Sequence, residues 1–137
     1  MTITTSKTGF IKIIVYALAA SAVATAANVI LYFISKSAGF LPDNALIPNQ
    51  SKPITLLPVI FSSIVPSIIA GLVMAITHRF AKNSKKIFNT IAVSLLIMSF
   101  ANPFFIPGVP MMMAIMLNLM HVTVAGSLIY TFNKYII

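Results

Sequence analysis

The side chains most able to bind a ligand or transfer a proton in this sequence are amides, hydroxyls and an imidazole. They interrupt long apolar stretches. Asn118 and His121 lie three residues apart, so a helix would place both on one face. The same spacing separates Thr25 from Asn28. Burying an amide or an imidazole in an apolar medium is costly unless it finds a hydrogen-bond partner. We therefore expect both faces to turn inward and meet, and the candidate ligand-binding residues are His121, Asn118, Asn28, Ser62 and Ser63.

These polar residues have two interpretations, which the sequence leaves open. An ionisable group within a membrane-spanning segment is a functional-site candidate, and His121 could donate, accept or relay a proton. Neutral His and Asn side chains also join helices by hydrogen bonds without any further function. Ser62 and Ser63 have a similar structural alternative, because their hydroxyls could satisfy a carbonyl that Pro66 leaves free. His78 is expected to be solvated at the membrane interface.

The sequence gives little support to the common catalytic and metal-binding chemistries. It contains one acidic residue, Asp43, and no cysteine, so it lacks a carboxylate pair, the acid of a serine triad and thiolate ligands. It has no glycine-rich phosphate loop. Five methionines crowd residues 111–120, but three of them are consecutive and cannot share the face that a thioether copper site needs. We predict no catalytic residue, no metal site and no cofactor.

The elements that must position the polar residues follow from composition. Hydrophobic residues make up 59% of the chain and charged residues 7%, against roughly 45–50% and about 25% in soluble domains. Four apolar stretches reach the length of about 20 residues that a bilayer requires, at about 11–35, 54–77, 87–106 and 111–132. Backbone polar groups in lipid must be satisfied within their own segment, which predicts helices. The predicted fold is an all-α bundle of four transmembrane helices forming a single membrane domain, residues 1–137.

Small residues indicate how the predicted helices pack. Helix association in lipid depends on close van der Waals contact, which small side chains allow. Ser63, Ser67, Gly71 and Ala75 recur at four-residue steps in the second stretch, and the first stretch is rich in alanine. We expect this stripe to pack against another helix of the same chain.

The positive charges predict the orientation of the bundle. The formal net charge is +8, and short loops rich in Lys and Arg stay in the cytoplasm. Only Lys36 and Lys52 lie on the opposite side from the remaining cations, so both termini are predicted to be cytoplasmic. At about 1.5 Å per residue, the candidate polar residues then fall in the outer half of the bilayer. The cations assigned to the cytoplasmic side are Lys7, Lys12, Arg79, Lys82, Lys85, Lys86 and Lys134.

Several short motifs resemble those of an uncharacterised bacterial family of small four-helix integral membrane proteins, a domain of unknown function. They are the sequence from Pro53 to Pro58, Arg79-Phe80 with Phe88, Met120-His121, and Asn28. The resemblance covers nearly the whole chain. It implies the four-helix fold and a multi-pass location in the bacterial inner membrane, and it supplies no activity.

The favoured function is a non-enzymatic binding protein or accessory subunit whose polar layer binds a small molecule, a lipid headgroup or a partner helix. The alternative is an oligomeric transporter or channel that uses His121 as a relay, and a membrane enzyme with His121 as base ranks last. The expected partners are the lipid bilayer and a membrane protein or further copies of the chain, and nucleic acid is not among them. A water-filled path past His121 to both sides would favour transport, whereas a closed bundle would favour binding.

Overall fold

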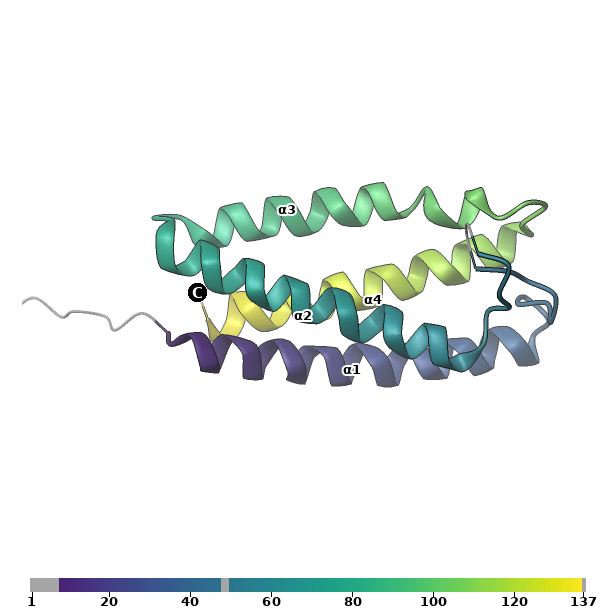
Figure 1. Cartoon of the computed structure of the whole chain (residues 1–137), viewed down its shortest axis with the longest axis horizontal. Coiled ribbons are helices and arrows are strands. Elements are labelled where there is room, and N and C mark those ends of the chain that lie inside the picture. The colour runs from purple at the N-terminus through teal and green to yellow at the C-terminus, as the bar shows by residue number, and fades with distance from the viewer. Residues whose placement is uncertain (1–7, 48–49, 137) are drawn as a thin grey trace, which may run out of the picture.

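Four long helices run side by side in the computed structural model, which describes residues 8–47 and 50–136 (Figure 1). Each is long and apolar enough to cross a membrane, the third when its short extension is included, and no strand occurs in these ranges. The predicted all-α, four-helix fold is therefore confirmed. Lys7 and Pro48 lie outside the described residues. The helices are α1 (Phe10–Ser37), α2 (Leu56–Phe80), α3 (Ser84–Ser99) and α4 (Met111–Tyr135), with a 3-10 helix, η1 (Asn102–Phe105), after α3.

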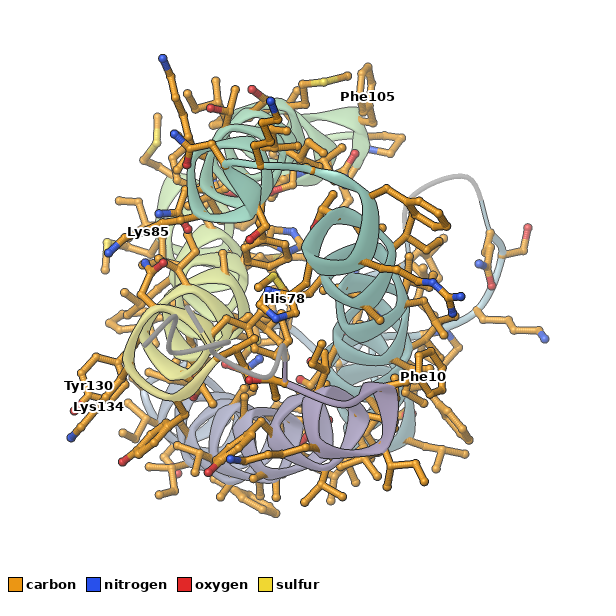
Figure 2. The ribbon with its side chains drawn as sticks, turned by 90° about the vertical axis from the view of Figure 1, so that its left-hand side faces the viewer. Phe10, His78, Lys85, Phe105, Tyr130 and Lys134 are labelled. Carbon is orange, nitrogen blue, oxygen red and sulfur yellow. The ribbon has the colours of Figure 1, made fainter. Side chains whose placement is uncertain are left out.

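The helices occupy the corners of a square when the bundle is viewed along its axis (Figure 2). α1 packs most extensively against α2 and α4, and α3 touches α2 and α4 more sparingly from the opposite corner. We call the end of the bundle that carries η1 and the α1–α2 loop the η1 end, and the other the turn end, after the α2–α3 turn.

Small residues bring α1 and α2 into close contact. The predicted stripe of Ser63, Ser67, Gly71 and Ala75 is buried along one face of α2. A Cβ atom added at Gly71 would lie 2.7 Å from the Cβ of Ala17 on α1. That distance is shorter than a carbon–carbon contact tolerates, so only glycine fits at this crossing.

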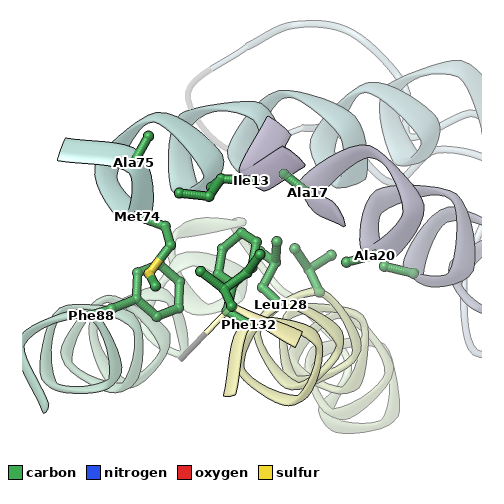
Figure 3. Packing of buried hydrophobic residues seen from close by; sticks show 11 residues of the cluster. Ile13, Ala17, Ala20, Met74, Ala75, Phe88, Leu128 and Phe132 are labelled. Carbon is green, nitrogen blue, oxygen red and sulfur yellow. The ribbon is translucent and has the colours of Figure 1, made fainter. Parts of the chain in front are cut away.

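The turn end has a hydrophobic core (Figure 3). Ile13, Met74, Phe88 and Phe132 come from all four helices and are almost completely buried. The rings of Phe88 and Phe132 meet edge to face, with centroids 5.0 Å apart, a favourable geometry for aromatic pairs. Phe88 is the one large buried side chain of α3, so this core holds α3 to the bundle mainly at the turn end.

The third helix differs from its predicted extent of 87–106. It begins earlier, at Ser84, because the Asn83 side chain accepts a hydrogen bond from the Lys86 amide, 3.2 Å away, and caps the helix. It ends earlier, at Ser99. Pro103 has no amide hydrogen to bond the Ser99 carbonyl, and its ring would clash there, so the chain re-forms as η1. The bounds of α1, α2 and α4 differ from prediction by three residues or fewer.

Candidate functional site

A cavity of about 360 Å³ lies at the η1 end of the bundle. Its wall combines α1, α2, α4, η1 and the α1–α2 loop. The polar residues of the wall are Asn28, Ser62, Asn102 and His121, and its other side chains are aliphatic, proline or methionine. Sites for small molecules typically have volumes of about 300–1,000 Å³ and a few polar groups on an apolar wall. The cavity therefore has the size and the composition of a small-molecule site.

Asn28 is the most deeply buried polar residue of the wall, with 2% of its surface exposed. Its Nδ2 donates to Ser63 Oγ at 2.9 Å and to the Met120 carbonyl at 3.3 Å. The Ser63 hydroxyl donates its own proton to the Val59 carbonyl, 3.0 Å away, so toward Asn28 it can only accept. These contacts fix the amide orientation and leave Oδ1 buried without a partner.

His121 lies on α4 in the same wall, half-buried. Within the described residues its ring has no hydrogen-bond partner. A neutral imidazole carries one N–H donor and one nitrogen acceptor. The cavity wall thus combines the donor and acceptor of His121 with Asn28, whose Oδ1 has no partner among the described residues.

The cavity does not include two of the predicted site residues. Asn118 faces away and donates from Nδ2 to the Phe100 carbonyl at 3.3 Å, because positions three apart on a helix differ by about 60° around the axis. Ser63 is fully buried against α1 as the acceptor for Asn28. The expectation that Asn28, Asn118, His121 and Ser62 or Ser63 bond one another is confirmed for Asn28 and Ser63 and wrong for Asn118, which bonds the Phe100 carbonyl instead. Asn28, Ser62 and His121 share the cavity wall.

The hydroxyls of α2 differ in their surroundings from the prediction. Ser62 is exposed at the cavity wall, and its Oγ donates to the Val59 carbonyl at 3.0 Å. Ser63 donates to the same carbonyl. Neither hydroxyl bonds the Ser62 carbonyl, which would have received the missing amide hydrogen of Pro66. The predicted satisfaction of that carbonyl is therefore wrong, and both serines bond one turn further back.

Two polar residues have positions that sequence reasoning missed. Asn102 lines the cavity from η1, and Pro103 beside it is the signal that this asparagine leaves the helix. His78 points into the middle of the bundle at the turn end (Figure 2), where its Nδ1 lies 3.4 Å from Ser84 Oγ and its Nε2 is buried without a partner. The expectation of a solvated His78 is wrong, because this residue follows Met74 by one turn on the inward face.

The cavity has no charged wall residue. Asp43, the single acid of the chain, lies in the exposed α1–α2 loop and pairs with Lys36. The hydrogen bond from Lys36 keeps the pKa of Asp43 below its ordinary value, so this carboxylate stays ionised and solvated. Groups of three or more His, Cys, Asp or Glu that could hold a metal ion do not occur in the described part of the chain.

The cavity ends at the hydrophobic core. Val124 contributes to both the cavity wall and the core. Leu128 and Phe132 follow at one-turn steps on α4, both almost completely buried. Within the described residues, this packed layer separates the cavity from His78 and the turn end, so the bundle has a polar cavity at one end and a closed core at the other.

Comparison with known proteins identifies one protein-family model, described as a family of unknown function (DUF6069), that matches residues 11–136. No curated protein and no solved structure matches the chain.

Proposed function

The chain belongs to DUF6069, a family of unknown function, and we propose that it is a non-enzymatic membrane protein that binds a small molecule in the cavity at the η1 end. The four apolar helices indicate a multi-pass membrane protein. We place it in the bacterial inner membrane with both termini in the cytoplasm, which puts the cavity in the outer half of the bilayer.

One observation carries the proposal: Asn28, whose buried side-chain oxygen has no partner in the described part of the chain, lines a cavity of about 360 Å³ together with His121. A buried unpaired acceptor costs about 1–3 kcal/mol. If Asn28 and Ser63 served only to join two helices by a hydrogen bond, no open space beside them would be needed. A bound molecule that donates a hydrogen bond to Oδ1 accounts for both the space and the free acceptor.

Binding is favoured over the two alternatives by what surrounds His121. A base for hydrolysis or proton abstraction works with a nucleophile, a carboxylate or a metal, and the wall offers only amides and a serine hydroxyl beside the imidazole. A relay for transport needs a hydrated path to the turn end, where the core is packed in the described residues. The closed core supports a binding role.

Occupation of the cavity is tested by blocking it. Ser62→Trp places an indole at the exposed edge of the wall, and Ser94→Trp places the same group on the exposed surface of α3, outside the wall. Each protein is purified in mild detergent, checked for a monodisperse peak, and extracted for small molecules that are identified by mass spectrometry. The wild type and Ser94→Trp are expected to retain a molecule that Ser62→Trp lacks. Equal amounts of the same molecules in both variants would contradict the proposal.

A further inference from the structure

We infer that the ligand is a neutral aliphatic lipid with a hydroxyl headgroup, an inference that rests on the proposed binding function. Within the described residues, the wall of the cavity contains no Asp, Glu, Lys or Arg and no Phe, Tyr or Trp. An ionic headgroup there would lose its hydration without gaining a counter-charge. The wall therefore selects against carboxylates, phosphates and ammonium groups and suits an uncharged ligand.

The polar groups of the wall match a hydroxyl. Asn28 Oδ1 is a buried acceptor that no described protein group satisfies, so a donor on the ligand would complete its hydrogen bonding. His121 offers an N–H donor and a nitrogen acceptor. A hydroxyl donates one proton and accepts through its lone pairs, so it offers a donor for the Asn28 acceptor and an acceptor for the His121 N–H. A hydrocarbon could satisfy neither residue.

The apolar part of the wall accommodates a chain. Ile54 and Val59 from the α2 side and Leu117 and Met120 from α4 surround the space, and methionine adapts to irregular aliphatic shapes. Ser62 and Asn102 line the cavity and are exposed, so the cavity reaches the surface between α2 and η1. The outer surface of α2 is rich in exposed apolar residues such as Phe61 and Val65, which suits contact with acyl chains. An amphiphile can therefore enter from the bilayer with its hydroxyl leading.

Photolabelling tests the ligand class directly. The probes are 1-decanol and decanoate, each carrying a diazirine at the middle of the chain, and the protein is reconstituted in phosphatidylcholine vesicles at neutral pH. Peptide mass spectrometry locates the labelled residues. We expect the alcohol to label residues of the cavity wall, with loss of labelling in excess decanol and retention in excess decane or decanoate.

Two double variants test the role of the Asn28 acceptor. Asn28→Leu with Ser63→Ala removes both partners of one interhelical hydrogen bond together with the free acceptor. Asn133→Leu with Asn89→Ala removes a comparable bond, 3.3 Å long, at the turn end. Loss of one hydrogen bond should raise the probe concentration for half-maximal labelling about fivefold, in the first variant only. An equal rise in both variants would overturn the role of Asn28.

The outcomes separate the ligand class from the binding function. Cavity labelling by decanoate equal to or stronger than labelling by the alcohol would overturn the hydroxyl assignment and leave the binding function standing. Equal competition by decane would do the same, because it would remove the need for a headgroup. Labelling of no cavity residue by either probe would overturn the hydroxyl assignment, and the Ser62→Trp extraction would then decide the binding function separately.

Discussion

Asn28 joins three helices through one amide group. Its Nδ2 bonds Ser63 on α2 and the backbone of Met120 on α4, and its own position is on α1. Interhelical hydrogen bonds in membrane proteins contribute about 0.6 kcal/mol on average, with a maximum of about 1.7 kcal/mol. The Ser63 contact lies within a fully buried face, so it should fall in the upper part of that range.

Ser63→Ala should lower the free energy of unfolding by about 1 kcal/mol, because it removes the interhelical acceptor of Asn28. Ser62→Ala is the matched control, since its hydroxyl bonds only the Val59 carbonyl of its own helix. Unfolding in mixed micelles with increasing dodecyl sulfate measures both, and a double-mutant cycle with Asn28→Ala isolates the pair. A control variant as destabilised as Ser63→Ala, or a cycle with no coupling, would show that Asn28 and Ser63 do not fasten the helices.

The contact between α1 and α2 is the most extensive one between two helices. It depends on Gly71, which faces Ala17 without room for a methyl group. Helices held by close contact rather than by water-driven burial are sensitive to such a change, because lipid offers no compensating hydrophobic gain.

Gly71→Ala should destabilise the protein by about 1–3 kcal/mol through overpacking. Gly126→Ala on α4 is the control: a Cβ there meets nothing within 4 Å, and alanine favours a helix by about 1 kcal/mol over glycine. The same unfolding assay compares them. Adding Ala17→Gly to Gly71→Ala should restore part of the loss, and a double variant no more stable than Gly71→Ala would argue against direct contact between these two positions.

The helices could be predicted from the length of the apolar stretches, and the packed face of α2 from the spacing of its small residues. The four helices and the inward face of α2 follow from these patterns, and so do the positions of Asn28 and His121 in one cavity wall. The early end of α3 was not predicted, because hydropathy continues unchanged past Ser99 and only Pro103 interrupts the backbone bonds. The bond between Asn28 and Ser63 agrees with the prediction. The prediction for Asn118 is wrong, because helical spacing indicates which half of a helix surface two residues share but not which neighbour each one contacts.

The whole molecule is strongly polarised in charge. The sequence contains nine Lys and Arg residues and one acidic residue, Asp43. Asp43 pairs with Lys36 at the η1 end. The cations of the turn end, including Lys12, Lys82 and Lys134, therefore lie far from any aspartate or glutamate of the chain. Anionic lipid headgroups attract such clusters, which supports the proposal that the turn end is the cytoplasmic one.

A reporter enzyme fused after Ile137 should be active only in the cytoplasm, because short basic loops resist export. The same reporter inserted between Asp43 and Asn44, in the exposed α1–α2 loop, should be active only outside. Paired fusions of a phosphatase and a fluorescent protein in intact cells measure both positions. The reverse pattern would place the cavity in the inner half of the bilayer and contradict the orientation.

The contact between α1 and α4 has a consequence for biosynthesis. Asn28 and Met120 are 92 residues apart, and the ribosome makes α4 after α1, α2 and α3. Until α4 enters the bilayer, the face of α1 that packs against α4 lacks this neighbour. That face includes the Asn28 amide. The hairpin of α1 and α2 can form the bond between Asn28 and Ser63 before α4 arrives, whereas the bond to the Met120 carbonyl waits until α4 is in place.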